Sequence, residues 1–525
     1  MKWIRPKYTA TVQEYEARLA KRGVSLANDS RRMPVFMAAG SGSGKSRFLG
    51  RLWAWQDFLK WKATIILDPH GMTIDNFLDK LSRLPPIFPF ELRERLWQRV
   101  CYVDMSGRLG YVTPLPLYYR LGNESLFDIA QRYIDVVRKI DPSLQSASIE
   151  GYNAFKRVAA NVGMLLAAMD YQITEAAHLL RAPEAWLPRA RNARTVYGPE
   201  LDPAIAFLTQ FESDKGPISP RLTASFLNKV DPFELDPTMR AMFGMQIPGI
   251  DWQEVLDKRL IVLLDFRHVG DLERRQFLMM WAYHYLMSFI RHRGPGRHEP
   301  VSLIVDELAA LFPMSGLVAN QFAADLDEMI NQIARNYSLW VMLATQELYQ
   351  FEERLQKTLL SMTLLQGRTS DPESATMLAQ RLNRYDPYKV KMWENVWGSM
   401  FGWPQVLEKR PVLFTPEEQQ ILTSYHYMDL QQFEFEARLP RGEGNYTGGT
   451  RNFSITALDP GHFPDEELVA EARRLLVQRD GTPISAALEE VEARRQLTQE
   501  SRKRTRGRKR KPQPPAIEAS GELDI

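Results

Sequence analysis

The sequence predicts an α/β fold in which a mainly parallel sheet carries a phosphate-binding loop. Short apolar runs recur along the chain with helical segments between them, which is the pattern of a parallel sheet. Most of these runs do not alternate between apolar and polar residues, as is typical of strands buried on both faces. One run leads directly into a glycine-rich segment that precedes a helical pattern. Together these observations predict a sheet domain that binds a phosphate-containing ligand.

The first expected strand, 34–38, leads into the sequence A-G-S-G-S-G-K-S at 39–46. Its glycines let the backbone curl so that N–H groups face phosphate oxygens, and the following helix N-terminus favours the same anion. We expect Lys45 to reach the β and γ phosphates of a nucleotide and Ser46 to bind Mg²⁺. A flexible turn is the alternative, but such a turn rarely places Lys-Ser directly after its last glycine. The predicted nucleotide-binding residues are Gly40, Ser41, Gly42, Ser43, Gly44, Lys45 and Ser46.

Further strands are expected at 63–67, 100–103, 259–264, 301–305, 339–344 and 362–366. The strand signal disappears from about 120 to 245, where helical patterns are separated by prolines. We therefore expect a sheet domain in two parts, 34–115 and 251–440, with an all-α insertion at 116–250.

The two ends of the chain are expected to lie outside this domain. A short segment, 1–33, precedes it. Residues 411–437 predict a helix followed by an edge strand, and a glycine-rich segment marks a boundary just after 441. Helices near 464–477 and 483–500 predict a helical extension over 441–500, followed by a flexible basic tail at 501–525.

Two expected strands end in aspartate, and a nucleotide hydrolase needs one such carboxylate beside Mg²⁺. Asp306 is followed by Glu307, which could activate the attacking water. Asp265 is followed by Phe266-Arg267, which offers no base. We therefore assign Asp306 to the metal and Glu307 to catalysis, and expect Asp265 to hold a turn.

Several segments between 33 and 385 together carry a resemblance to a known family. They are A-G-S-G-S-G-K-S, I-L-D-P-H-G, L-I-V-D-E-L, A-R-N-Y-S-L-W-V-M-L-A-T-Q and G-R-T-S-D-P-E-S-A-T-M-L-A-Q-R-L. In order and spacing the chain resembles the HerA–FtsK clan of hexameric ATPases, and within it the coupling proteins and TraG-like DNA-transfer ATPases of conjugation and type IV secretion. Coupling proteins commonly carry N-terminal transmembrane helices, which the short segment before the first strand does not match.

The resemblance implies a RecA-like motor domain that uses ATP and Mg²⁺, assembles as a homohexamer and passes DNA through its pore. It also implies a relaxase or secretion-channel proteins as partners. Gln346, at the end of an expected strand, matches a polar residue that lies near the γ-phosphate in RecA-like ATPases. Arg335 and Arg368 are candidates for the arginine that a ring ATPase offers to the neighbouring subunit. Asp68 and His70 either touch the site or only form a turn, and the sequence leaves both readings open.

The charge of the chain is unevenly distributed and is concentrated near its C-terminal end. The net charge is +3, but 502–511 holds eight basic residues and no acidic one, which leaves the rest of the chain at −5. Such a run suits phosphate contacts to nucleic acid, with an anionic membrane surface and a solvated tail as alternatives.

Cys101 is the single cysteine, which excludes an internal disulfide. The longest apolar stretch, 277–290, is too short to span a bilayer, so we expect a cytoplasmic protein, or one peripheral at the inner face of the membrane.

The leading functional hypothesis is an ATP-hydrolysing ring motor that translocates DNA. A secretion-type ATPase that moves protein is the first alternative. A nucleotide-gated adaptor for DNA or membrane is the second, and Glu307 argues against it because a pure switch needs no strong hydrolytic base.

Overall fold

The computed structural model describes residues 33–508 except for 85–86, 214–219, 297, 312–323, 384, 401–402, 440–448 and 460–462. The described residues form two compact units. Unit 1 holds 33–113, 135–147 and 249–481, and unit 2 holds 114–134, 148–248 and 482–508.

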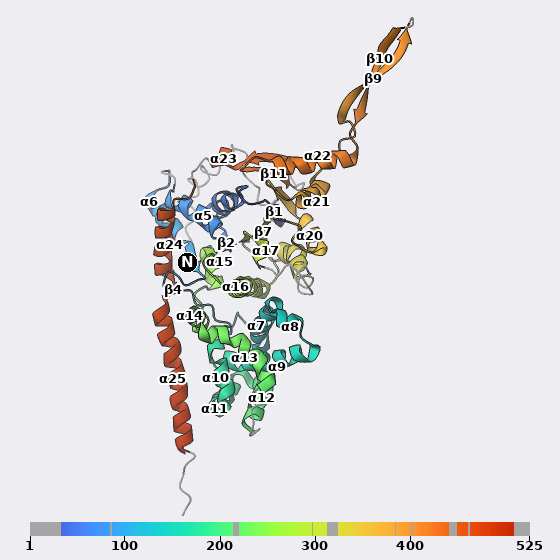
Figure 1. Cartoon of the computed structure of the whole chain (residues 1–525). Coiled ribbons are helices and arrows are strands. Elements are labelled where there is room, and N and C mark those ends of the chain that lie inside the picture. The colour runs from blue at the N-terminus through green and yellow to red at the C-terminus, as the bar shows by residue number, and fades with distance from the viewer. Residues whose placement is uncertain are drawn as a thin grey trace, which may run out of the picture. The chain divides into compact units, whose positions relative to one another are not determined.

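Unit 1 is built on a nine-stranded sheet with the order β12-β11-β8-β1-β7-β6-β2-β5-β3 (Figure 1). The seven strands from β8 to β3 are parallel, whereas β11 pairs antiparallel with both of its neighbours, β8 and β12. The strands are β1 (Val35–Ala38), β2 (Ala63–Asp68), β3 (Val100–Asp104), β5 (Ile261–Asp265), β6 (Val301–Val305), β7 (Leu339–Thr345), β8 (Thr363–Gln366), β11 (Glu434–Leu439) and β12 (Gly449–Ser454). The seven parallel strands are those that the apolar runs predict, so the predicted fold class is confirmed.

Two features of the sheet region differ from the prediction. β11 is not an edge strand, because β12 pairs along its outer side from Glu434↔Ser454 to Leu439↔Gly449. The polar sequence of β12, G-T-R-N-F-S, carries no apolar run that would have signalled a strand. The other feature is a two-stranded hairpin of β9 (Val390–Met400) and β10 (Trp403–Leu413). The helix that was predicted within 411–437 begins only after this hairpin, as α22 (Pro416–Asp429).

The helical run after β1 and three further helices cover one face of the sheet. The run comprises α3 (Lys45–Arg47), a π-helical stretch (Phe48–Ala54) and α4 (Trp55–Leu59), and the further helices are α5 (Met72–Ser82), α6 (Phe90–Gln98) and α24 (Glu466–Asp480). Their apolar side chains share one buried core with alternate strand residues such as Met37, Ile66 and Met342. Figure 1 shows α15 (Trp252–Lys258) and α16 (Leu272–Arg293) on the other side of the sheet. Further helices of unit 1 are α8 (Pro142–Gln145), α17 (Leu308–Leu311), α19 (Ala334–Asn336), α20 (Glu353–Leu360), α21 (Pro372–Leu382) and α23 (Ile455–Leu458).

Unit 2 is helical. Its main helices are α9 (Ile149–Ala168), α10 (Ala176–Arg181), α11 (Pro183–Tyr197), α12 (Asp202–Ser213), α13 (Pro220–Leu235), α14 (Pro237–Gly244) and α25 (Ile484–Arg508), and α7 (Leu126–Ile140) begins in it. A buried ion pair from Arg494 on α25 to Glu175, with 3.1 Å between Nη2 and Oε1, ties the C-terminal helix to this unit. α25 extends to Arg508 and so includes the start of the predicted tail, whereas 509–525 lie outside the described residues.

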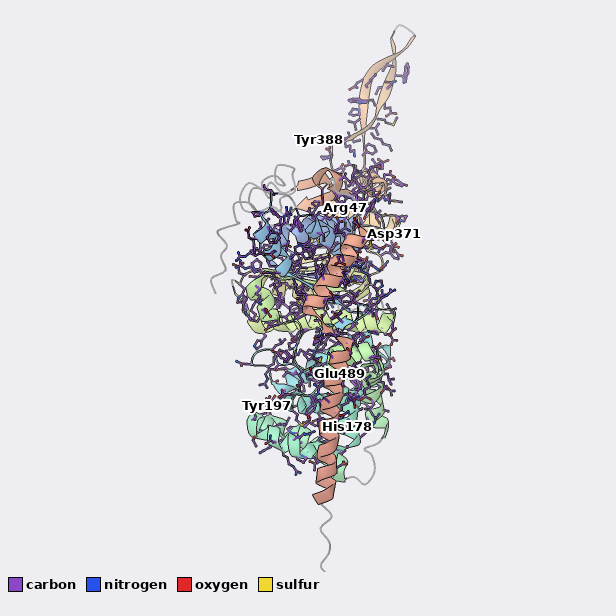
Figure 2. All side chains as sticks on the ribbon, turned by 90° about the vertical axis from the view of Figure 1, so that its left-hand side faces the viewer. Arg47, His178, Tyr197, Asp371, Tyr388 and Glu489 are labelled. Atoms are coloured by element: carbon purple, nitrogen blue, oxygen red, sulfur yellow. The ribbon has the colours of Figure 1, made fainter. Side chains whose placement is uncertain are left out.

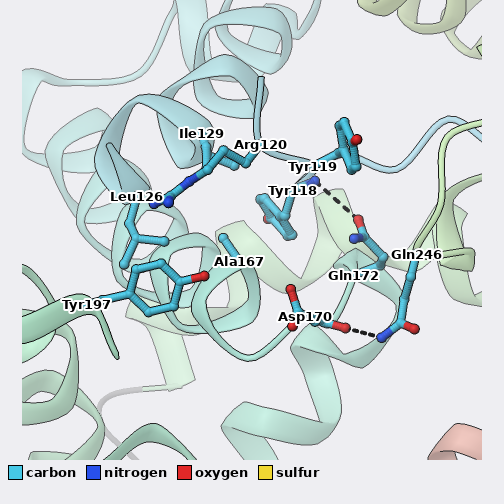
Figure 3. Close-up of a pocket in the computed structure, with 10 residues that line it drawn as sticks. All are labelled: Tyr118, Tyr119, Arg120, Leu126, Ile129, Ala167, Asp170, Gln172, Tyr197 and Gln246. Atoms are coloured by element: carbon cyan, nitrogen blue, oxygen red, sulfur yellow. Dashed lines mark hydrogen bonds between the residues drawn. The ribbon is translucent and has the colours of Figure 1, made fainter. Parts of the chain in front are cut away.

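A small cavity lies within unit 2 (Figure 3). Its volume is about 130 Å³, and its lining includes Tyr118, Arg120, Asp170, Gln172 and Tyr197. Sites for drug-sized ligands are typically ~300–1,000 Å³, so this cavity is too small for a nucleotide. No helix among the described residues has the length and apolar character needed to cross a membrane.

Candidate nucleotide-binding site

The glycine-rich segment forms a tight loop between β1 and α3. Gly42 and Gly44 have positive φ angles of 71° and 99°, which side chains other than glycine rarely adopt. A Cβ on Gly44 would also lie 2.4 Å from Cδ1 of Phe433, so a side chain there is excluded by contact as well as by conformation. The N–H of Phe433 donates to the carbonyl oxygen of Ser43 at 2.9 Å, and this contact holds the loop from outside.

The loop presents unsatisfied donors, as an anion site requires. Within the described residues, the backbone N–H groups of Ser41, Gly42 and Gly44 have no acceptor. The hydroxyl of Ser43 is buried and has no hydrogen-bond partner in the same part of the chain. Buried polar groups are normally paired, so these orphaned donors fit a phosphate ligand.

Asp306 follows β6, two strands from β1, and its carboxylate reaches the loop. Its Oδ2 accepts hydrogen bonds from Oγ of Ser46 at 3.0 Å and from Oγ1 of Thr73 at 2.8 Å. Its Oδ1 is buried without a hydrogen bond, and Nζ of Lys45 lies 3.6 Å away. A hydroxyl beside a carboxylate with an open oxygen is an oxygen donor set suited to Mg²⁺, which takes few protein ligands and keeps phosphate oxygens and water.

Glu307 is held between the loop lysine and the end of β7. Its Oε2 accepts from Nζ of Lys45 at 2.8 Å, and its Oε1 accepts from Oγ1 of Thr345 at 2.7 Å. The backbone N–H of Gln346 lies 3.4 Å from the same Oε1, while the Gln346 side chain is half-buried. Burial alone would lower the pKa of Lys45, but the Asp306 and Glu307 carboxylates outweigh it and raise that pKa above its usual value.

Asp265, at the end of β5, has a different environment. Its Oδ2 accepts from Nε of Arg267 at 2.8 Å and from the hydroxyl of Tyr102 at 3.0 Å. Arg267 also pairs with Asp75, with 2.6 Å between Nη2 and Oδ1. In the sheet, β7, β6 and β2 separate β5 from β1, so Asp265 belongs to an internal ion-pair network away from the loop.

Asp68, at the end of β2, fixes the start of α5. Its carboxylate accepts backbone N–H groups at 3.0 Å or less from His70, Gly71, Thr73 and Ile74. Burial, with Asp306 and Asp265 nearby, raises the pKa of Asp68 to about 8, although the hydrogen bonds from Ile74 and Gly71 act the other way. The His70 side chain is exposed. Asp68 therefore forms the turn and places Thr73 beside Asp306.

The two candidate arginines differ in what the structure describes. Arg368 follows β8 and is half-buried, and its carbonyl oxygen accepts from the N–H of Gly40 at 2.8 Å. Its Nη2 would lie 3.8 Å from a Cβ on Gly42, so its guanidinium is beside the loop of its own chain. Among the described residues this guanidinium has no hydrogen bond or ion pair. The backbone of Arg335 lies in α19, but its side chain is outside the described part.

The structure brings together Lys45, Ser46, Asp306, Glu307 and the N–H of Gln346, with Arg368 beside the same loop. Three further residues contact the site without having been predicted from the sequence: Thr73, Thr345 and Phe433. Thr345 stands directly before Gln346, and Thr73 directly follows the D-P-H-G-M turn, so position beside a predicted site residue was the available signal. Phe433 carries no comparable signal because its contact with the loop is distant in sequence.

The fold and the loop define a P-loop nucleotide-binding protein. No family model and no curated protein matches the chain. The chain is similar to solved structures of the bacterial conjugative coupling protein TrwB. The unbound TrwBdeltaN70 form is 14% identical, with 84% of this chain and 88% of that chain covered and a TM-score of 0.49. TrwB in complex with ADP and Mg²⁺ is also 14% identical, with 85% of this chain and 90% of that chain covered and a TM-score of 0.47. VirB4 of Thermoanaerobacter pseudethanolicus is 13% identical, with 67% and 81% covered and a TM-score of 0.39.

Proposed function

We propose that this protein is an ATPase that moves DNA as a ring of identical subunits. The observation that carries the ATPase part is the arrangement around the loop, where Lys45, Ser46, Asp306 and Glu307 are linked by contacts of 2.8–3.6 Å. A site for binding alone would not need a buried glutamate held on both oxygens beside the lysine of the loop.

In this proposal the loop N–H groups and Lys45 bind the phosphates of ATP. Ser46 and Asp306 would hold Mg²⁺, which would neutralise charge on the phosphate oxygens. Asp306 offers its open Oδ1 for this purpose, while Thr73 keeps the carboxylate oriented through Oδ2.

Glu307 acts as the general base. The phosphate oxygens of bound ATP attract the ammonium group of Lys45, so ATP binding weakens the 2.8 Å contact between Lys45 and Glu307. Thr345 continues to hold the other carboxylate oxygen. Glu307 then accepts a proton from water as the water oxygen bonds to the γ-phosphorus, and the bond from that phosphorus to the ADP oxygen breaks.

The arginines take separate roles. Arg368 lies beside the loop of its own chain, which favours contact with the phosphates in cis. Arg335, just before the strand that ends near Gln346, is proposed as the arginine offered to the neighbouring subunit. Arg335→Ala subunits should bind ATP but hydrolyse it poorly, and mixing them with Lys45→Ala subunits should restore part of the activity. Absence of recovery, when subunit exchange has been shown, would place Arg335 in cis or outside the site.

The experiment that tests the function is steady-state ATP hydrolysis with and without single-stranded and duplex DNA, alongside the mass by light scattering with nucleotide bound. Stimulation by DNA and a ring-sized mass are expected. A rate of ATP hydrolysis that does not change when DNA is added would favour a motor that moves protein. Absence of ATP hydrolysis would favour a nucleotide-gated adaptor.

The basic segment 502–511 is proposed as one DNA contact, made through charge alone. Deleting 501–525 should lower DNA affinity and reduce the salt slope by roughly 3–4 units if about half of its charges meet phosphates. An unchanged slope would remove this segment from the proposal.

A further inference from the structure

The β9–β10 hairpin has no part in the nucleotide site. Within the part of the chain that the structure describes, its strands pair only with each other, in a sheet separate from the nine-stranded one. Figure 1 shows it extending beyond α22, and Figure 2 shows side chains standing out from its strands above Tyr388, which is 83% exposed. An isolated two-stranded hairpin is marginally stable in water. Exposed apolar side chains on such a hairpin therefore indicate a surface that contacts a ligand or another macromolecule.

The register of the hairpin sorts its side chains onto two faces. Trp393 lies opposite Pro411, Asn395 opposite Lys409, and Trp397 opposite Val406. Directly paired residues of an antiparallel ladder lie on the same face, and every second residue of β9 returns to that face, so these three pairs share one face. We call it the tryptophan face, and it consists of Trp393, Asn395, Trp397, Val406, Lys409 and Pro411.

The two faces differ in charge. Glu394 and Glu408 both lie on the face opposite the tryptophans, where Glu408 pairs with Arg410 at 3.3 Å. The described residues of the tryptophan face include no carboxylate and one lysine, Lys409. Lys409 is exposed and has no ion pair among the described residues, whereas Lys391, at the irregular end of the hairpin, is paired with Glu418 of α22.

The two tryptophans are unusually open for residues of their size. Trp393 is 59% exposed and Trp397 is 63% exposed. They are four residues apart on one strand, which places them about 13 Å from each other at the usual rise of a strand. The pair of Asn395 and Lys409, both polar and exposed, lies between them.

We propose that the tryptophan face binds single-stranded nucleic acid, with bases stacked on Trp393 and Trp397 and a phosphate near Lys409. Aromatic rings beside cationic groups bind single strands with little sequence preference, because every base has a face to stack. A duplex keeps its base faces covered, so the face should distinguish single strands from duplexes. This inference rests on the proposed function, since it names the form of nucleic acid that such a motor would engage.

The test measures the affinity of the full chain for a fluorescent oligo(dT) of about 30 nucleotides, without ATP, at a salt concentration at which a duplex of equal length no longer binds. High salt suppresses contacts made by charge alone, such as those proposed for 502–511, and leaves stacking. The double variant Trp393→Ala, Trp397→Ala should bind roughly 10–100-fold more weakly, the scale of lost stacking on two bases. The matched control, Met392→Ala with Val412→Ala on the opposite face, should bind as the unaltered chain does.

Two further variants keep the test independent of folding. Trp393→Phe with Trp397→Phe retains both rings and should restore most of the affinity. Lys409→Gln should reduce the salt slope by about 0.7, whereas the tryptophan variants should leave the slope unchanged.

An unchanged affinity in the double alanine variant would overturn the proposal. A loss of affinity that occurs only together with a loss of oligomer mass would also overturn it, because the tryptophan face would then bind a second copy of the chain. Ile421 and Tyr425 on α22 are exposed and offer an apolar surface for such a contact. Failure of ATP hydrolysis in the unaltered chain would count against the proposed function but would not affect this binding measurement, which uses no nucleotide.

Discussion

The ends of β6 and β5 place the same chemical group in two different environments. Both strands end in a buried run followed by aspartate, and Asp306 and Asp265 are 1% and 2% exposed. Asp265 is satisfied by Arg267 and Tyr102, whereas Asp306 meets hydroxyls and keeps one oxygen without a hydrogen bond. A buried carboxylate that is paired with a fixed arginine is already satisfied within the fold, while one with an open oxygen beside a phosphate loop is available to a ligand.

The residue after each aspartate strengthens this contrast. Glu307 lies beside Lys45, and Phe266 at the equivalent position after β5 is buried and carries no ionisable group. Four changes around the loop test the function of the site at the end of β6, and a fifth change, at Asp265, tests the end of β5.

The largest effect is expected at Glu307. Glu307→Gln should keep ATP affinity, because the amide retains the shape of the side chain, but should lower turnover by ~100-fold or more, the scale of a lost general base. Nucleotide affinity and steady-state turnover measured on one preparation would check this. Normal turnover would remove Glu307 from catalysis.

Lys45→Ala should act on binding. It removes the cation that faces the phosphates and leaves Glu307 without its 2.8 Å partner. ATP affinity should fall roughly 10–100-fold, as for the loss of a hydrogen bond between charged groups. Titration calorimetry with a non-hydrolysable ATP analogue measures the change, with Lys62→Ala as a control on a lysine away from the loop. Equal affinities in the two variants would contradict the assignment.

Arg368 tests whether the guanidinium beside Gly42 acts on its own loop. Arg368→Ala should lower turnover by about tenfold, the scale of one charge-assisted contact to phosphate. Because the proposed contact is in cis, mixing with Lys45→Ala subunits should restore no activity, in contrast to Arg335→Ala. Recovery on mixing would show that Arg368 acts on the neighbouring subunit.

Thr345 should have the smallest effect. Thr345→Val keeps the shape of a fully buried side chain and removes the hydrogen bond that positions Glu307. Turnover should fall by about threefold to tenfold with affinity unchanged, and Thr345→Ser should recover most of it. A loss of thermal stability without a change in turnover would leave Thr345 a structural role only.

The sequence predicted the parts of this protein that have a strong local pattern. Buried parallel strands carry uninterrupted apolar runs, and the loop carries its glycines and Lys-Ser together, so both could be recognised from short segments. The preference for Asp306 over Asp265 depended on one neighbouring residue, Glu307, and it stays a prediction. The structure places the two aspartates in distinct surroundings.

Other features depend on contacts between distant segments. Nothing near Phe433 indicates that it packs on Gly44, and nothing near Arg368 distinguishes it from other arginines at strand ends. The hairpin escaped prediction because Trp393 and Met392 are exposed on opposite faces, so the strand lacks the alternation of buried and polar positions that marks a half-buried strand.

The most direct test of the difference between the two strand ends is the rate of ATP hydrolysis by Glu307→Gln and Asp265→Asn, measured side by side at saturating ATP and Mg²⁺ on folded protein. Asp265→Asn should unfold at a lower temperature, because Arg267 loses a buried partner, but should hydrolyse ATP within about twofold of the unaltered chain. Glu307→Gln should be slower by ~100-fold or more. A large loss of turnover in Asp265→Asn with normal turnover in Glu307→Gln would contradict the assignment and move the hydrolytic acid to β5.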